Sequence, residues 1–243
     1  MSILTLQDIS KTFSGIEVIK NLNMQVNDGE FVSILGPSGS GKSTLFSLIG
    51  GILTPEKGTI LLEDDIINGR TGSISYMPQS SSLLPWRTVL QNVLLGQELT
   101  AKKNKEKAMQ MLEKAGLTSY VHAYPHELSG GMKQRVSFIR ALLSPQPLIL
   151  LDEPFSALDE LTRLDMQKWL LSMWENNRQT VLFITHNIEE ALFLSDRIVI
   201  LSNKPASIVS EFVIPFKRPR DEELFLTEEF LEWRRKIYRT LKV

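Results

Sequence analysis

The sequence predicts an α/β fold: a mostly parallel sheet with helices, an antiparallel β region at its N-terminal end and a helical insertion in its middle. Two observations carry this prediction. Helical periodicity occupies Leu90 to Leu143, and strand-like runs return after it at 147–152, 180–185 and 197–201, with helical segments between them. Before the insertion, short apolar runs are separated by turn signals such as NDGE and PEKG. These earlier runs are ILTL at 3–6, LNMQV at 22–26, FVSIL at 31–35 and TILLE at 59–63.

The composition is that of a globular protein with a sizeable core. The chain has 243 residues, 42% of them hydrophobic, and no cysteine, so disulfides and thiolate metal sites are excluded. Its 27 basic and 28 acidic residues give a net charge of −1, which favours no nucleic-acid partner. The N-terminus lacks the apolar core of a signal peptide, and the longest apolar stretch, 45–53, is about half the ~20 residues of a membrane span. If the protein works at a membrane, we expect it to dock on another protein there.

The segment GPSGSGKS, at 36–43, follows the apolar run FVSIL and precedes a helical segment. Strand, glycine loop and helix together predict a phosphate-binding loop, in which backbone N–H groups converge on the phosphates of a nucleotide. Lys42 would reach the terminal phosphates, and the Ser43 hydroxyl would ligate Mg²⁺. A glycine-rich turn without a ligand is the alternative. The nucleotide-binding residues expected here are Gly36, Pro37, Ser38, Gly39, Ser40, Gly41, Lys42, Ser43 and Thr44.

Four polar residues stand where other predicted strands end. Asp152 and Glu153 follow LILL, which suits Asp152 to Mg²⁺ contact and Glu153 to general-base work on water. His186 follows VLFIT, and Gln79 follows SISYM. His186 could bond the γ-phosphate, and Gln79 could touch Mg²⁺ or the attacking water. Each could instead be a structural cap, but all four are expected at one edge of the sheet.

The segment LSGGM, at 128–132, predicts a second anion-binding corner in a chain that already has one. Ser129 is a good N-cap, Gly130 and Gly131 let backbone N–H groups approach a ligand, and an apolar stripe that includes Met132 and Val136 anchors the following helix. An ordinary helix cap is the alternative for an isolated serine–glycine pair.

In this order, the motifs resemble those of the nucleotide-binding subunit of ATP-binding cassette (ABC) transporters, from Phe13 to about Leu201. The resemblance implies ATP and Mg²⁺ as cofactors, and Phe13 where the family places an adenine-stacking aromatic, usually tyrosine. It also implies a second copy of the chain, whose phosphate loop faces Ser129 and Gly131 across a shared ATP site. The matching motifs are GPSGSGKS (Walker A), Gln79 (Q-loop), LSGGM (signature), LILLDE (Walker B), SALD at 156–159 (D-loop) and His186 (switch histidine).

The signature departs from the family at position 132, where the family usually has glutamine. Methionine cannot hydrogen-bond as glutamine does, yet the Ser-Gly-Gly backbone is retained. We therefore expect ATP hydrolysis to survive this change.

The stretch after Gln79 resembles importers of nitrate, aliphatic sulfonates and taurine, and so does KRPRD near the C-terminus. The resemblance implies a permease contact near Leu84, Pro85, Trp86 and Arg87, although Trp86 could instead be a core residue. It further implies a peripheral protein on the cytoplasmic face of the cell membrane. A periplasmic or lipoprotein substrate-binding protein is expected in the same system, and the direction of transport rests on the resemblance alone.

Residues 1–83 and 147–214 are expected to form the α/β core with its β region, 84–146 the helical signature part, and 215–243 a linker and helix. Thr227 is the predicted N-cap of that last helix, which we expect to pack on the surface rather than to serve docking or regulation. Two other functions remain open. They are a soluble cassette ATPase not coupled to transport, such as one acting on ribosomes or DNA, and a small-metabolite kinase.

Overall fold

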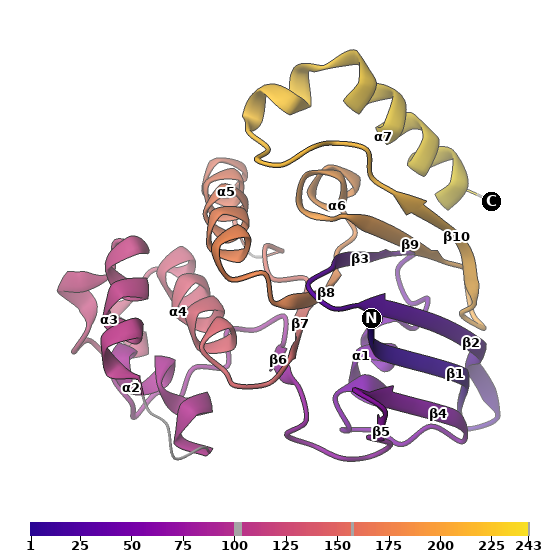
Figure 1. Cartoon of the computed structure of the whole chain (residues 1–243), viewed down its shortest axis with the longest axis horizontal. Helices are drawn as coiled ribbons and strands as arrows, with labels where there is room; N and C mark the ends of the chain where they lie inside the picture. Colours follow the sequence, from indigo (N-terminus) through magenta and orange to yellow (C-terminus); the bar gives the residue numbers. More distant parts are fainter. Residues whose placement is uncertain (100–103, 157, 243) are drawn as a thin grey trace.

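The computed structural model describes residues 1–99, 104–156 and 158–242, and it contains two β-sheets (Figure 1). The first sheet is antiparallel, with strand order β2-β1-β4-β5. Its strands are β1 (Ser2–Phe13), β2 (Ile16–Asn27), β4 (Lys57–Leu62) and β5 (Asp65–Ile66).

The first strand is longer than its apolar run predicts. β1 continues from ILTL to Phe13 because the hydrogen-bonded ladder with β2 holds polar residues as well as apolar ones. Strand β4 approaches β1 so closely that a Cβ at Gly58 would lie 2.2 Å from the carbonyl oxygen of Gln7. Only glycine, with its φ of +89°, fits this crossing.

The second sheet has the order β10-β9-β3-β8-β7-β6. All its pairings are parallel except that of β10 with β9, so the predicted mostly parallel sheet is confirmed. Strands β3, β7 and β8 are buried along their whole length, which explains their nearly continuous apolar sequences. The strands are β3 (Phe31–Leu35), β6 (Ser75–Met77), β7 (Leu148–Asp152), β8 (Thr180–Ile184), β9 (Arg197–Leu201) and β10 (Ile208–Val213).

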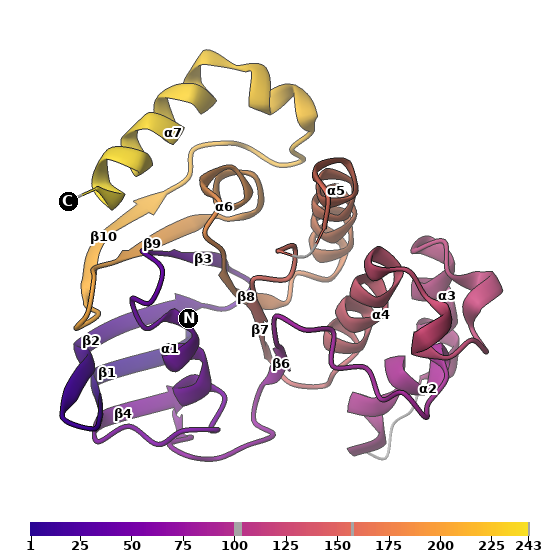
Figure 2. The same cartoon turned by 180° about the vertical axis from the view of Figure 1, so that it is seen from behind.

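Helix α1 (Lys42–Ile49) lies between the two sheets, as both views show (Figures 1 and 2). Its apolar side chains share one buried cluster with Leu4 of the first sheet and with Val32 and Leu150 of the second. The helix that begins at the glycine loop is therefore held from both sides.

Helices α2, α3 and α4 form a group beside the far edge of the second sheet, on the other side of the molecule from β1 and β2 (Figures 1 and 2). The predicted helical span from Leu90 to Leu143 is divided into separate helices, and α3 ends at Lys114 because Gly116, with φ +69°, follows its last turn. Residues 100–103 of that span lie outside the described residues. The elements here are α2 (Val89–Val93), η1 (Leu95–Leu99), α3 (Lys105–Lys114), η2 (Thr118–Tyr120), η3 (Pro125–Glu127) and α4 (Gly130–Leu142).

The C-terminal helix packs on the domain as expected. Thr227 caps it by accepting a hydrogen bond from the Phe230 N–H at 3.2 Å, and Phe230 and Ile237 are buried beside Phe216. Within the described parts of the chain, no helix is long and apolar enough to cross a membrane. The remaining helices are α5 (Glu160–Asn177), α6 (Ile188–Leu194), η4 (Glu222–Leu226) and α7 (Glu228–Leu241).

Candidate functional site

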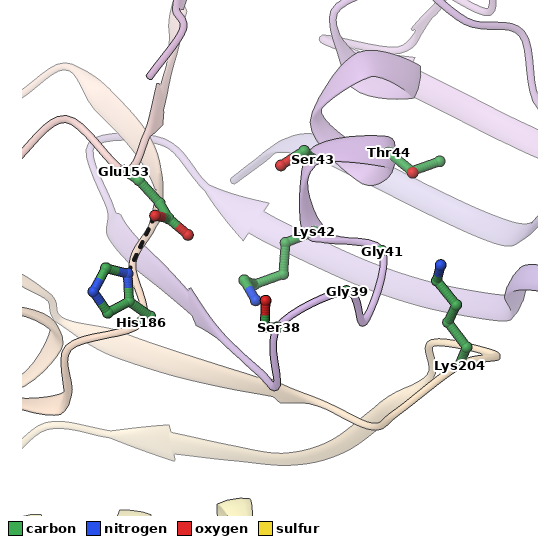
Figure 3. Close-up of a pocket in the computed structure, with 9 residues that line it drawn as sticks. All are labelled: Ser38, Gly39, Gly41, Lys42, Ser43, Thr44, Glu153, His186 and Lys204. Carbon is green, nitrogen blue, oxygen red and sulfur yellow. Dashed lines mark hydrogen bonds and ion pairs between the residues drawn. The ribbon is translucent and has the colours of Figure 1, made fainter. Parts of the chain in front are cut away.

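A cavity of about 560 Å³ opens at the start of α1, where strands β3, β7 and β8 end (Figure 3). Ligands of open α/β sheets bind at this edge, so its position agrees with the site predicted from the sequence. The lining residues are Ser38, Gly39, Gly41, Lys42, Ser43, Thr44, Glu153, His186 and Lys204.

The glycine loop turns sharply before α1 begins. Gly39 and Gly41 have φ angles of +76° and +109°, and a Cβ at Gly41 would lie 3.1 Å from a methyl group of Val18. Glycine at position 41 thus satisfies both the backbone conformation and the space available. The loop presents the N-terminal end of α1 to the cavity, where unpaired N–H groups attract anions.

Lys42 holds the loop from within. Its Nζ donates hydrogen bonds to the carbonyl oxygens of Gly36, at 2.8 Å, and Pro37, at 2.9 Å. Burial lowers the pKa of Lys42, and the negative charges of Glu153 and Asp152 partly oppose that effect. The ammonium group is a cation at the cavity wall, close to where the sequence predicts terminal phosphates.

The expected loop residues divide into two groups. Gly36, Pro37 and Ser40 are not among the residues that line the cavity. The first two support Lys42 through their carbonyl groups, and the buried Ser40 hydroxyl has no hydrogen-bond partner in the described part of the chain. The other expected residues, Ser38, Gly39, Gly41, Lys42, Ser43 and Thr44, line the cavity.

Asp152, the last residue of β7, is 7% exposed and accepts a hydrogen bond from the Tyr76 hydroxyl at 3.3 Å. Burial, with the negative charge of Glu153, raises the pKa of Asp152 above its ordinary value, and hydrogen bonds from Tyr76 and Ser43 and the charge of Lys42 only partly oppose that rise. Burial also raises the pKa of Tyr76, so its hydroxyl keeps its proton as donor. The Ser43 hydroxyl and the Asp152 carboxylate are neighbours, so both offer oxygen atoms to a metal ion at the same place.

These oxygen donors fit Mg²⁺ better than a softer metal. Among the described residues, no group of three or more His, Cys, Asp or Glu could hold a metal ion. Mg²⁺ needs no such group, because it usually binds one or two protein oxygens and takes its other ligands from phosphates and water.

Glu153 and His186 face each other across one side of the cavity (Figure 3). The Oε2 atom of Glu153 lies 3.2 Å from Nδ1 of His186. The backbone of Glu153 has a φ of +44°, rare for a residue other than glycine, and its N–H donates to the carbonyl of Ile184 at 2.9 Å. That bond holds Glu153 to the end of β8, and the left-handed backbone conformation follows at the point where the carboxylate reaches the cavity.

Gln79 and Phe13 lie outside the cavity wall. Gln79 is exposed, and its Nε2 donates to Ser156 Oγ at 3.3 Å, which places it beside the expected D-loop. Ala157 of that motif lies outside the described residues. Phe13 ends β1 with 41% of its surface exposed, and Lys11 Nζ lies 5.3 Å from its ring centroid.

The second predicted anion-binding site, LSGGM at 128–132, does not lie beside the glycine loop of the same chain. Ser129 caps α4 by accepting a hydrogen bond from the Met132 N–H at 3.3 Å. Ser129 and Gly130 are exposed, Gly131 is half-buried, and none of the three lines the cavity. Helix α4 stands in the helical group, away from α1 (Figures 1 and 2).

Among the described residues that line the cavity, only Lys204 was not predicted from the sequence. It belongs to the turn between β9 and β10, more than 160 positions after Lys42. The segment SNKPAS carries only ordinary turn residues, so nothing in it indicates an anion site.

Together, the buried strand β3, the glycine loop and the acidic pair at the end of β7 define a P-loop nucleotide-binding site. A family model described as "ABC transporter" matches residues 19–156, more than half of the chain. This chain therefore belongs to the ABC transporter family, as an ATP-binding cassette, and the family predicted from the motifs is confirmed.

Two relatives and one solved structure illustrate the similarity. The formylaminopyrimidine import ATP-binding protein ThiZ of Halalkalibacterium halodurans is 45% identical over 217 residues, which cover 88% of this chain and 85% of ThiZ. The aliphatic sulfonates import ATP-binding protein SsuB of Bacillus cereus is 40% identical over 227 residues, covering 91% of this chain and 90% of SsuB. The dimeric structure of MJ0796, a bacterial ABC transporter cassette, gives a TM-score of 0.76 at 31% identity and covers 88% of this chain and all of that one.

Proposed function

We propose that this cassette hydrolyses ATP to energise an importer for a small molecule of the nitrate, sulfonate and taurine type. The observation that carries the proposal is the cavity in which Lys42 and Ser43 of the glycine loop meet Glu153 and His186 from the ends of two other strands. The names of ThiZ and SsuB, both import ATP-binding proteins, support the direction of transport and the class of cargo.

The loop residues bind and orient the nucleotide. Lys42 exchanges its two carbonyl partners for oxygens of the terminal phosphates, and the N–H groups around Gly39 and Gly41 receive the other oxygens. Ser43, Asp152 and Gln79 would hold Mg²⁺ through their side-chain oxygens, and the metal would supply positive charge beside the phosphates. Phe13, exposed at the end of β1, stacks on adenine.

Glu153 is the general base, because its carboxylate faces the cavity where water would attack the γ-phosphate. His186 positions that carboxylate through the 3.2 Å contact and directs its other ring nitrogen to the γ-phosphate. Gln79 stands beside the D-loop, where it can orient the water.

A complete site takes its second half from another copy of the chain. Ser129, Gly130 and Gly131 do not line the cavity of their own chain, and a Cβ at Gly130 would have open space around it. The exposed end of α4 is thus free to contact the phosphates held by a facing subunit. The dimeric structure of MJ0796 supports this arrangement.

The permease contact is centred on Trp86. Its side chain is 70% exposed, so the alternative of a core residue does not describe it. Arg87 is already paired with Glu98, at 2.7 Å, which leaves Trp86 as the anchor between Leu84, Pro85 and the ion pair. Docking here puts the subunit on the cytoplasmic face of the membrane, as a peripheral protein, with a periplasmic or lipoprotein substrate-binding protein delivering cargo to the permease.

Mixing two defective subunits tests the shared site. Lys42→Ala and Ser129→Arg should each abolish hydrolysis, whereas mixed dimers regain one intact site, so an equal mixture should recover about a quarter of the wild-type rate. The control is the Lys42→Ala variant alone, taken through the same mixing step. If the mixture of Lys42→Ala and Ser129→Arg subunits recovered no activity, that result would contradict a site shared between subunits. Cargo uptake by vesicles containing the partner permease separates an importer subunit from a cassette ATPase not coupled to transport.

A further inference from the structure

Lys204 places a second cation on the nucleotide cavity, on an element that carries none of the family motifs. We propose that Lys204 is a nucleotide-positioning residue that binds the α-phosphate and ribose end of ATP and ADP. This inference rests on the proposed function, because it concerns the same cavity.

The hairpin that carries Lys204 is tied to the first sheet. The Ala206 N–H donates to the carbonyl of Val18 at 2.8 Å, and the Lys20 N–H donates to the carbonyl of Ala206 at 3.1 Å. Val18 also lies against Gly41, because a Cβ at Gly41 would be 3.1 Å from a methyl group of Val18. The same short stretch of β2 therefore fixes both the glycine loop and the backbone two residues after Lys204.

The turn itself is closed by hydrogen bonds. The Ser202 hydroxyl donates to the carbonyl oxygen of Asn203 at 2.8 Å, and it accepts a hydrogen bond from the Ser207 N–H at 3.0 Å. The Ser202 N–H donates to the carbonyl of Ser207 at 2.9 Å. A turn fastened at both ends presents the Lys204 side chain from a defined place, and little ordering of the backbone remains to be done on binding.

The charge of Lys204 is available to a ligand. The side chain is exposed, and Lys204 forms no ion pair with any residue in the described part of the chain. The other cation of the cavity, Lys42, is held by carbonyl oxygens of the loop. An anion entering the cavity therefore meets one cation from α1 and another from the β9–β10 turn.

Figure 3 shows on which side of the glycine loop each group lies. Glu153 and His186 lie on one side of the loop, and Lys204 lies on the other, beyond Gly41 and on the same side as Thr44. Since Glu153 and His186 stand at the bond that breaks, Lys204 faces the part of the nucleotide that does not change during hydrolysis. A contact made equally in the ground state and the transition state changes affinity and leaves the catalytic rate constant unaffected.

The test measures dissociation constants of ATP and ADP by calorimetry with isolated subunits, together with kcat and KM. For Lys204→Ala we expect both dissociation constants to rise by the same factor, about three- to fivefold at low salt, with KM rising and kcat unchanged. Lys204→Arg should bind both nucleotides as the wild type does, because it keeps the charge. Lys217→Ala, which removes an exposed lysine outside the cavity, is the matched control.

Three results would overturn the inference: nucleotide affinities within twofold of the control, a loss confined to ATP, or a fall in kcat at unchanged affinity. A loss confined to ATP would place Lys204 at the γ-phosphate. Lys42→Ala separates this inference from the function itself. If Lys42→Ala loses ATP binding and Lys204→Ala does not, only the role of Lys204 fails, whereas unchanged binding in both variants overturns the nucleotide site.

Discussion

The Nδ1 atom of His186 lies 3.2 Å from Oε2 of Glu153, although 33 positions separate the two residues in the sequence. The two residues follow neighbouring parallel strands, β8 and β7, and the pairing of Asp152 with Ile184 brings the strand ends level. Among the residues drawn in Figure 3, His186 is the one joined to the Glu153 carboxylate by a side-chain hydrogen bond. This contact therefore orients the carboxylate.

Replacement of Glu153 by glutamine should stop hydrolysis without preventing ATP binding. Glutamine keeps the shape of the side chain and removes its basicity, and loss of a general base costs about 100-fold or more in rate. We expect phosphate release to fall by at least that factor and an ATP-dependent dimer to accumulate in size-exclusion chromatography. Glu17→Gln, on the exposed face of β2, is the control, and a Glu153→Gln subunit that still turns over at more than a tenth of the wild-type rate would rule out this base.

The signature methionine should have little effect on catalysis. Met132 is half-buried against the core of the helical group. Its hydrogen bond to the Ser129 hydroxyl is donated by its backbone N–H, which any residue other than proline provides. We expect Met132→Gln to change the ATPase rate by less than about tenfold, which corresponds to ~1.4 kcal/mol in the barrier. A larger increase in steady-state hydrolysis would show that a glutamine side chain here contacts the reacting groups.

Removal of the Trp86 side chain should weaken coupling to the permease. A central aromatic anchor typically contributes about 2 kcal/mol or more to an interface, so Trp86→Ala should lower the affinity for the permease by ~30-fold. Binding of ATP to the isolated subunit should be unaffected. Copurification with detergent-solubilised permease measures the effect, and Tyr120→Ala, another exposed aromatic of the helical group, is the control. Equal recovery of both variants would move the contact away from Trp86.

The C-terminal helix should stabilise the domain through its inner face. Ile237 is fully buried, so Ile237→Ala should lower the free energy of unfolding by about 2–4 kcal/mol. Its neighbour Tyr238 is 51% exposed, and Tyr238→Ala should change stability by less than ~0.5 kcal/mol. Urea denaturation of both variants distinguishes packing from a purely regulatory role, for which Ile237→Ala would leave stability unchanged.

A buried carboxyl near His186 should give stability a measurable pH dependence. Glu190 accepts hydrogen bonds from Gln167, at 3.2 Å, and Thr185, yet burial raises its pKa above the ordinary value of 4.5. The folded state therefore binds more protons at this site than the unfolded state, so its contribution to stability falls as pH rises from 4.5 through the folded pKa. Relative to Glu190→Gln, the wild type should lose stability across that window and then level off. A difference that grew with pH would contradict this sign.

The sequence predicted the parallel sheet and the main cavity residues because those features are local. A buried strand, a glycine loop and a helix follow one another in the chain, and Asp152 and Glu153 follow a run of apolar residues. The edge where parallel strands end is common to the whole sheet, so His186 could be placed there without knowledge of the tertiary structure.

Lys204 could not be placed in that way, because its position depends on pairing between distant segments. The bridge between Ile19 and Ala206 joins the turn after β9 to β2, and no pattern in either segment indicates the pairing. The length of β1 was also underestimated, since the polar residues between Gln7 and Thr12 join the ladder through their backbones. Contacts set by backbone pairing leave little trace in side-chain periodicity.

The bonds from Lys42 to the carbonyls of Gly36 and Pro37 bear on how fast the nucleotide arrives and leaves. A loop that already holds its shape around an internal ammonium group needs no slow rearrangement before a phosphate enters, so association should proceed at the same speed across loop variants that keep this lysine. Differences in affinity among such variants would then appear as residence time. If the observed rate constant in stopped-flow traces instead reached a plateau at high ATP concentration, the loop would be closed and would have to open before ATP binds.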